Sequence, residues 1–346
     1  MFLHYCDGTS YTSFRQDPVP VPPSVAATVT LDLLTQNKST SASAVPSQLY
    51  FRGRANLAAT TAWLLASEGM SGASDIVISG GSAGATGVYL GADAFRALVP
   101  ANIRVVANPD AGFFLDLPRA SNSSFYWYRE SFHAADSVWG SIAAGNLNSN
   151  CLAAYKTEPW LCYLAQYATP FIAVPLYISN SAIDMWGLGN VIQLGCIPSM
   201  LNTSVGIPGK FCDPSGWVEL QSWWSSFQAA LLPLLQRNPA LGAWVVSCYV
   251  HEINVDYCSS QSLPNCRGWK TYKIGGDTLS TAFPAWHTAA LANWAHTVQT
   301  FQNKAEEASR HDGGVNHFSI DSALAKGQSV DQYTYPMNPS CIYPPG

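Results

Sequence analysis

Charged side chains are scarce in this sequence. Lys, Arg, Asp and Glu make up 11% of its 346 residues and the formal net charge is −5, so the basic surface with which proteins bind nucleic acid is missing. No apolar run approaches the roughly 20 residues that a membrane-spanning helix needs. Hydrophobic residues nevertheless reach 48%, enough for a large buried core. We therefore expect a globular protein, one domain over residues 1–346, with no nucleic-acid partner and no membrane span.

Metal-binding cysteine pairs are also missing. The nine cysteines include no CxxC pair, and their closest spacings do not resemble the ligand set of a zinc or iron–sulfur site. Asn37, Asn122 and Asn202 begin possible N-glycosylation triplets. Together these features favour an oxidising, secretory setting with disulfides and no bound metal.

The first residues differ from the pattern expected of a secretory signal peptide. Residues 1–14 have neither a charged n-region nor an apolar h-region and are typical of the middle of a domain. The odd number of cysteines points the same way. We expect the natural start of the protein to lie upstream of Met1.

Apolar, β-rich runs alternate with helical patterns along the chain. Buried strands are expected at residues 75–81, 102–110, 170–179 and 242–251, and helices at 84–98, 217–236 and 279–308. This alternation predicts an α/β fold with a mostly parallel sheet flanked by helices. In such sheets functional residues gather at the carboxyl ends of the strands.

A serine between glycines follows the first of these strands. Gly80-Gly81-Ser82-Ala83-Gly84 matches G-x-S-x-G in a strand–turn–helix context, in which the serine hydroxyl is exposed at the edge of the sheet. The glycines are expected to permit a tight, strained turn. The N–H groups at the start of the following helix are available to an oxyanion. Ser82 is therefore the candidate nucleophile.

A serine nucleophile needs a histidine base and an orienting carboxylate. The α/β-hydrolase order is Ser, Asp or Glu, His, for which His4 and His133 come too early. His251 follows a predicted strand and opens a loop, whereas the histidines at 287, 296, 311 and 317 lie in helical patterns or a polar loop. Asp184, just past the third strand, is the preferred acid, and Asp110 is its rival.

Several segments then resemble one family, in order along the chain. The sequence is similar to the pectin acetylesterase and Notum carboxylesterases at Tyr5–Phe14 (YCDGTSYTSF), Tyr50–Ala59 (YFRGRANLAA), Ile78–Asp93 (ISGGSAGATGVYLGAD), Asp110–Asp116 (DAGFFLD), Ser181–Asn190 (SAIDMWGLGN), Cys248–Glu252 (CYVHE) and Asn338–Cys341 (NPSC). The resemblance implies a secreted α/β-hydrolase-like enzyme that removes acyl groups from oxygen esters without a cofactor. It places the nucleophile on Ser82, the acid on Asp184 and the base on His251, and leaves Asp110 to hold nearby loops together.

One departure from the family concerns the oxyanion hole. In the family a glycine-rich loop precedes the YCDG segment and supplies part of this site, and the sequence begins after it. Ala83 N–H is the matched donor that remains, with Gly81 and Gly84 beside it in the elbow. The resemblance also implies that missing early strands would open an edge of the sheet. An inactive fragment or glycan-binding remnant is therefore one alternative function.

The resemblance further implies four disulfides and a substrate class. The pairs are Cys151–Cys162, Cys196–Cys212, Cys248–Cys341 and Cys258–Cys266, with Cys6 left over. The expected substrate is a pectin-like acetylated polysaccharide in the cell wall or extracellular space, with the protein acting as a monomer. A Notum-like deacylase of palmitoleoylated protein is the second alternative. Trp127, Trp186 and Phe113 are candidates for a sugar platform or acyl pocket.

Overall fold

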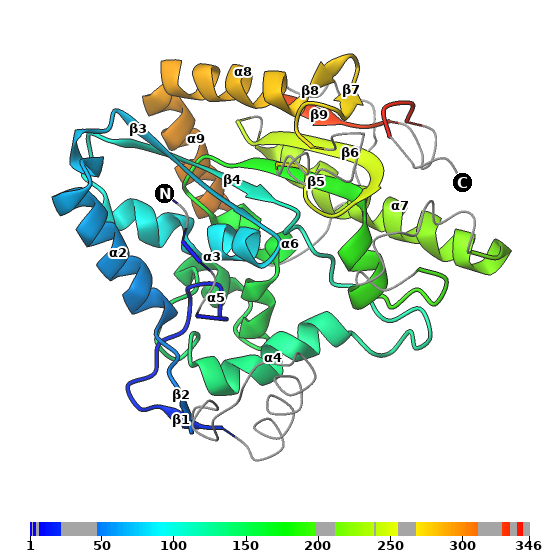
Figure 1. Cartoon of the computed structure of the whole chain (residues 1–346), viewed down its shortest axis with the longest axis horizontal. Helices are drawn as coiled ribbons and strands as arrows, with labels where there is room; N and C mark the ends of the chain where they lie inside the picture. The colour runs from blue at the N-terminus through cyan, green and yellow to red at the C-terminus, as the bar shows by residue number, and fades with distance from the viewer. Residues whose placement is uncertain are drawn as a thin grey trace, which may run out of the picture.

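A sheet of parallel strands forms the centre of the molecule (Figure 1). The computed structural model describes residues 1, 3–4, 7–21, 47–197, 212–238, 240–254, 268–310, 327–332 and 338–341. The sheet has the order β3-β4-β5-β6-β9, with strands β3 (Asp75–Gly81), β4 (Arg104–Asp110), β5 (Tyr177–Asp184), β6 (Gly242–Val250) and β9 (Gln328–Val330). Two short antiparallel pairs lie outside it, β1 (Val19–Pro20) with β2 (Gln48–Leu49) and β7 (Lys273–Ile274) with β8 (Asp277–Thr278).

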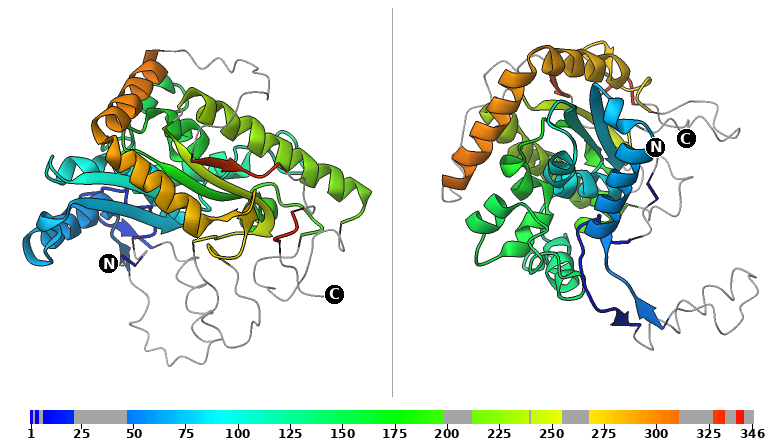
Figure 2. Two further views of the ribbon diagram at one scale, coloured as in Figure 1. Left: turned by 90° about the horizontal axis from the view of Figure 1, so that it is seen from above. Right: turned by 90° about the vertical axis from the view of Figure 1, so that its left-hand side faces the viewer.

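Helices cover both faces of the sheet (Figure 2). The longer ones are α2 (Gly53–Ser67), α3 (Ala83–Leu98), α4 (Trp127–Trp139), α7 (Pro214–Arg237), α8 (Leu279–Ala292) and α9 (Trp294–Arg310); the shorter ones are α5 (Ser149–Ala154) and α6 (Ala165–Ala168). Helices α3 and α7 share one hydrophobic core with the sheet, and α8 packs in a second core on the opposite face. The predicted α/β architecture is confirmed.

The period of two in each strand divides its side chains between these cores. On β4, Val105 and Ala107 belong to the core that contains α3 and α7, whereas Val106 belongs to the core that contains α8. On β6, Val245 and Val246 divide in the same way. Both faces of these strands are apolar because both are covered by helices, which is typical of a parallel sheet.

Strand β3 has one partner in the described part of the chain, the strand β4. Its side chains are only partly buried, and Val77 is 41% exposed. The expectation of a fully buried strand at residues 75–81 is therefore wrong, because β3 lies at the edge of the sheet.

Two other boundaries differ from the sequence prediction. The third strand begins at Tyr177 rather than near Pro170, since residues 169–171 form a 3₁₀ turn, and it extends to Asp184. The helix expected over 279–308 is two helices, α8 and α9, which are separated at Asn293. Strand β9 was not predicted, because three residues carry too little periodic signal.

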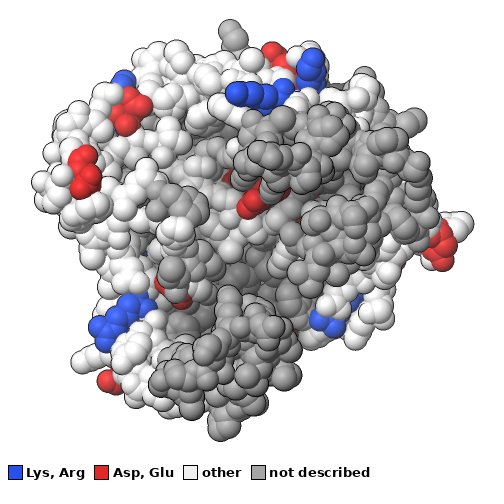
Figure 3. Space-filling view, in the orientation of Figure 1, with Lys and Arg blue, Asp and Glu red and all other residues white. Residues whose placement is uncertain are grey.

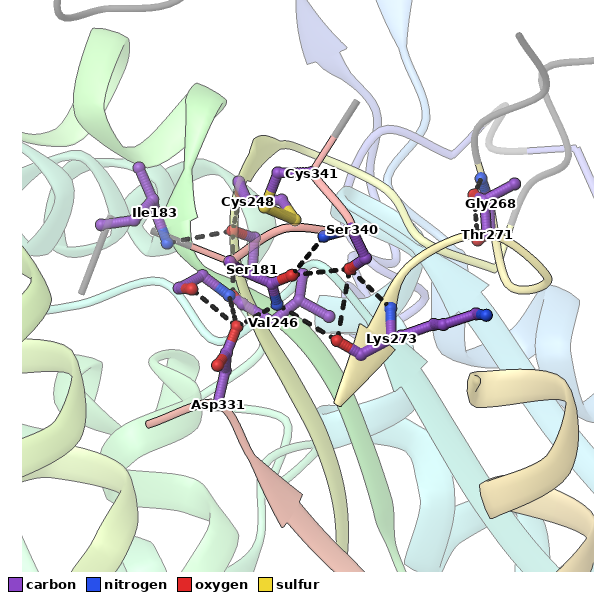
Figure 4. Close-up of a disulfide and its surroundings, with 12 residues drawn as sticks. Ser181, Ile183, Val246, Cys248, Gly268, Thr271, Lys273, Asp331, Ser340 and Cys341 are labelled. Atoms are coloured by element: carbon purple, nitrogen blue, oxygen red, sulfur yellow. Dashed lines mark hydrogen bonds between the residues drawn. A yellow bond between two sulfur atoms is a disulfide. The ribbon is translucent and has the colours of Figure 1, made fainter. Parts of the chain in front are cut away.

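Three of the expected disulfides are formed: Cys151–Cys162, Cys196–Cys212 and Cys248–Cys341. Figure 4 shows the last of them, which joins the end of β6 to the C-terminal segment. The expected pair Cys258–Cys266 and the residue Cys6 lie outside the described residues.

Charged side chains are widely spaced on the face shown in Figure 3, and those in colour form no continuous basic patch. Within the described part of the chain, no helix combines the length and the apolar character needed to cross a membrane.

Candidate active site

The four residues singled out from the sequence lie at one edge of the sheet. Ser82 follows β3, Asp110 ends β4, Asp184 ends β5 and His251 follows β6. Because the strands are parallel, their carboxyl ends share one edge, and the four side chains are brought together although up to 169 positions separate them.

Ser82 occupies a strained turn between β3 and α3. Its φ is 55° and its ψ is −118°, a backbone conformation that non-glycine residues seldom adopt. The turn is held by a hydrogen bond from Ser82 N–H to the carbonyl of Asp110, at 2.9 Å, and by one from Thr86 N–H to the carbonyl of Ser82. The geometry is that of a nucleophile elbow.

The glycines around Ser82 contribute differently from the sequence expectation. The positive φ belongs to Ser82 itself, and neither Gly80, Gly81 nor Gly84 has one. At Gly80 a Cβ would lie 2.5 Å from the Gly84 carbonyl oxygen, and at Gly81 it would lie 2.4 Å from Oε1 of Glu252. Gly80 is therefore needed for close approach of the Gly84 backbone rather than for backbone freedom, whereas at Gly81 the neighbouring group is the end of the Glu252 side chain.

Ser82, His251 and Asp184 form a continuous hydrogen-bonded chain. Ser82 Oγ lies 2.7 Å from His251 Nε2, and His251 Nδ1 lies 2.8 Å from Asp184 Oδ2. The histidine and the aspartate are both buried. With a carboxylate at Nδ1, the favoured neutral tautomer carries its proton on Nδ1 and leaves Nε2 to accept the serine hydroxyl.

The second oxygen of Asp184 is fixed as well. Asp184 Oδ1 accepts a hydrogen bond from Gly187 N–H at 2.6 Å. A residue with a Cβ cannot replace Gly187 without displacement, because the Cβ would lie 2.5 Å from the ring of Trp223. The carboxylate is therefore oriented from both sides.

A register shift between β5 and β6 sets the position of Asp184 relative to His251 along the strand direction. Ser181 pairs with Val246, but Ile183 pairs with Tyr249, so β6 gains one residue on β5. Ser181 Oγ hydrogen-bonds to backbone groups at the register shift. It donates to the carbonyl of Cys248 and accepts from Ile183 N–H at 3.0 Å (Figure 4). The sequence carried no clear signal for this bulge.

The buried carboxylate and imidazole shift each other's protonation. Burial raises the pKa of Asp184, and the hydrogen bonds from His251 and Gly187 oppose this rise. Burial lowers the pKa of His251, but the Asp184 carboxylate outweighs it, so that the pKa of His251 lies above its ordinary value. A raised pKa makes the imidazole a better proton acceptor.

Asp110, the rival acid, does not contact His251 by a hydrogen bond. Its buried carboxylate accepts from Ile253 N–H at 2.9 Å and from Asn254 N–H at 2.7 Å, in the segment that follows the histidine. Burial raises the pKa of Asp110 to about 7, and these backbone hydrogen bonds oppose the rise. Asn108 supports the same segment through a 2.7 Å hydrogen bond from Asn254 Nδ2.

Two aromatic rings stack beside the imidazole, at interplanar angles of 29° and 24°. Phe114 and Trp186 have ring centroids 6.0 and 6.3 Å from that of His251. Trp186 was a candidate from the sequence, whereas Phe114 was missed, although it lies in the same segment as the candidate Phe113. Phe113 itself is 1% exposed and packs against Phe227 in the core, so it cannot be part of a sugar platform.

A second strained turn lies beside the start of α3 and was not predicted. Ser10 and Tyr11 both have positive φ, and Ser10 Oγ donates to the carbonyl of Ala83 at 3.3 Å. Thr9, Ser10, Thr12 and Ser13 are all buried, and most of their hydroxyl groups are hydrogen-bonded to one another or to the backbone. The turn thereby anchors the first turn of α3, which begins at Ala83.

The described residues include no cluster of three or more His, Cys, Asp or Glu side chains that could hold a metal ion. The chemistry available to this site from its own residues is proton transfer along the Ser82–His251–Asp184 chain and attack by the serine oxygen.

Comparison with known proteins relates the sequence of this chain to a family. The family model for pectinacetylesterases matches residues 1–342. Pectin acetylesterases 7 and 11 of Arabidopsis thaliana are 26% and 27% identical over 304 and 307 residues. Each alignment covers 87% of the chain and 65% of the relative, so the chain spans about two thirds of the length of these relatives.

Solved structures share the fold. Two crystal forms of the Wnt deacylase Notum from Drosophila superimpose with TM-scores of 0.60 and 0.62 at 21% and 19% identity. They cover 83% and 98% of this chain, which in turn covers 67% and 71% of theirs. This likeness confirms the α/β-hydrolase-like fold. Because the family match runs over nearly its whole length, the chain belongs to the pectinacetylesterase family.

Proposed function

We propose that this protein is a serine carboxylesterase that hydrolyses O-acyl esters, with Ser82 as nucleophile, His251 as general base and Asp184 as the residue that orients the histidine. The observation that carries the proposal is the hydrogen-bonded chain Ser82 Oγ···His251 Nε2 and His251 Nδ1···Asp184 Oδ2, at 2.7 and 2.8 Å, at the end of a nucleophile elbow. Membership of the pectinacetylesterase family supports it independently.

In the proposed reaction Ser82 Oγ attacks the ester carbonyl carbon while His251 Nε2 takes the hydroxyl proton. The resulting imidazolium is stabilised by Asp184 and gives its proton to the departing alcohol as the acyl-serine forms. Water then attacks the acyl-serine, with His251 again as base. The product acid leaves and the serine regains its proton.

The negative oxygen of the tetrahedral intermediate needs hydrogen-bond donors. Ala83 N–H is the first donor of α3 and lies next to the nucleophile, at the positive end of the helix dipole. Ser10 Oγ donates to the carbonyl of Ala83, in the peptide that follows this N–H group, and so anchors the first turn of α3. We assign Ala83 to the oxyanion hole.

The acyl group that this site favours is a short one, most simply acetyl. Phe114 and Trp186 pack against the imidazole, and the two rings also pack against each other with centroids 4.6 Å apart. The names of the relatives point to acetylated pectin as the carrier. The three disulfides favour an extracellular or cell-wall location.

The proposal is tested with a fluorophosphonate probe and two chromogenic esters. The probe should label Ser82 in the folded chain, and the Ser82→Ala variant should remain unlabelled. Turnover of p-nitrophenyl acetate should exceed that of p-nitrophenyl octanoate. The reverse preference would favour a lipid deacylase, and a folded chain that neither labels nor turns over either ester would contradict the esterase proposal.

Opening the space beside the imidazole should lengthen the accepted acyl chain. In Trp186→Ala we expect the octanoate-to-acetate ratio of kcat/KM to rise about tenfold or more, because burying extra methylenes is worth about 0.8 kcal/mol each. The matched control is Trp160→Ala, since Trp160 stacks on His133 rather than on His251. A ratio that rises equally in both variants would show that Trp186 does not limit the acyl chain.

The raised pKa of His251 sets the acidic limit of activity. The base must be neutral, so kcat/KM should rise as the pH increases through the pKa of His251, which lies above the ordinary value of about 6.5. Loss of activity on acidification should therefore begin in the neutral range while circular dichroism still reports a folded chain. A midpoint below about 6.5 would mean that burial outweighs Asp184.

A further inference from the structure

A carboxylate lies against the residue that precedes the proposed nucleophile. Oε1 of Glu252 would be 2.4 Å, and its Cδ 3.0 Å, from a Cβ placed on Gly81. The Glu252 carboxyl group therefore occupies the space that a side chain at position 81 would fill. Glu252 is half-buried, and it directly follows His251 in the sequence.

The residues on both sides of Glu252 are anchored. His251 is held by the hydrogen bond to Asp184, and Ile253 and Asn254 donate their N–H groups to the Asp110 carboxylate. The start of the Glu252 side chain is thereby fixed at the site. The contacts that position the base therefore also hold the Glu252 backbone, and its carboxyl group lies against Gly81.

The charge of Glu252 reaches the neighbouring groups. The pKa of His251 is raised above its ordinary value chiefly by Asp184 acting against burial, and Glu252 and Asp110 add to the rise. Glu252 also contributes to the raised pKa of Asp110, for which burial is the largest cause. A negatively charged group on a bound substrate would meet the same repulsion, because a partly buried site screens charges less than bulk water does.

We propose that Glu252 is a specificity-determining residue that favours esters on uncharged carriers over esters whose carrier bears a carboxylate close to the acyl group. The inference rests on the proposed esterase function and concerns the same site. On an acidic polysaccharide it directs deacetylation to stretches in which the carboxyl groups are esterified or absent. Such like-charge discrimination is a recognised route to specificity.

Two matched acetate esters test the proposal: 4-acetoxybenzoate, which is anionic, and its neutral methyl ester. The measured quantity is the neutral-to-anionic ratio of kcat/KM at low ionic strength. In Glu252→Gln we expect the ratio to fall about three- to tenfold relative to wild type, since the repulsion between two partly screened charges is lost. Comparing the ratio between variants cancels the intrinsic reactivity of the two esters.

The matched control is Glu68→Gln, which removes the same charge from the exposed end of α2. It should leave the ratio unchanged. If both esters are hydrolysed with dependence on Ser82 and Glu252→Gln does not change the ratio, the assignment of Glu252 is wrong and the esterase proposal stands. If neither ester shows Ser82-dependent hydrolysis, the esterase proposal itself fails.

Salt gives a second measurement that does not depend on the folding of a variant. In the wild-type protein the neutral-to-anionic ratio should fall as sodium chloride is increased, because exposed and half-buried charges are screened. As a separate check, the variant Glu252→Asp should keep most of the wild-type neutral-to-anionic ratio at low salt, since it retains the charge. A wild-type ratio that does not depend on salt would overturn the proposal.

Discussion

Replacing Asp184 with asparagine is expected to lower kcat for p-nitrophenyl acetate about 10⁴-fold, although the change replaces a single oxygen atom. Gly187 N–H donates to Oδ1 of Asp184, so an asparagine here places its oxygen toward Gly187 and its NH₂ group toward His251. The imidazole must then accept at Nδ1 and carry its proton on Nε2. A histidine protonated on Nε2 cannot accept the Ser82 proton.

The control for this prediction is that the losses of activity in the single variants should not add in the double variant. Ser82→Ala removes the nucleophile, and the double variant Ser82→Ala/Asp184→Asn should be no less active than Ser82→Ala alone, because the residues act as one unit. Circular dichroism and a thermal melt verify that both single variants are folded. A fall in kcat of less than about tenfold for Asp184→Asn, in a folded protein, would remove Asp184 from the proposed mechanism.

Removal of the Cys248–Cys341 disulfide should have the largest effect on stability. The bond closes a loop of 93 residues, and the chain-entropy model gives a stabilisation of about 4 to 5 kcal/mol for such a loop. We expect the double variant Cys248→Ala/Cys341→Ala to lose about this much free energy of unfolding in urea titration. The pH of maximal activity should not change, because His251 keeps its partners.

A second disulfide serves as the matched control. Cys151 and Cys162 are separated by 11 residues, and on the same model their removal should cost about 2 kcal/mol less than removal of the long-loop bond. Equal losses for the two pairs would show that loop length does not govern the effect. In that case the packing of the buried sulfur atoms would be the better explanation.

The positions of the main site residues could be predicted because they depend on sheet topology. The carboxyl ends of two parallel strands are marked by Ser82, which has glycines on both sides, and by His251. Each follows an apolar, β-rich segment of the sequence. Strand position favoured Asp184 over Asp110, but the hydrogen bond to His251 that distinguishes them could not be predicted in this way, since both residues end strands. It depends on the register between β5 and β6, where one extra residue brings Asp184 level with His251.

Contacts between loops were beyond the reach of sequence patterns. The position of Glu252 against Gly81 results from the path of two separate segments, and no periodicity reports it. The same holds for Phe114, which turns toward the imidazole while Phe113 turns into the core. In the segment that follows β4, adjacent residues face different environments. The sequence pattern does not predict which of their side chains points toward the site.

Asp110 links the two halves of the proposed machinery. Its carbonyl accepts the Ser82 N–H, and its carboxylate accepts the N–H groups just after His251. Because both segments are hydrogen-bonded to the same residue, we expect a displacement of the end of β4 to move Ser82 and the segment after His251 together, so that the distance between Ser82 and His251 changes less than either position. The end of β4 therefore couples the position of the proposed nucleophile to that of the proposed base.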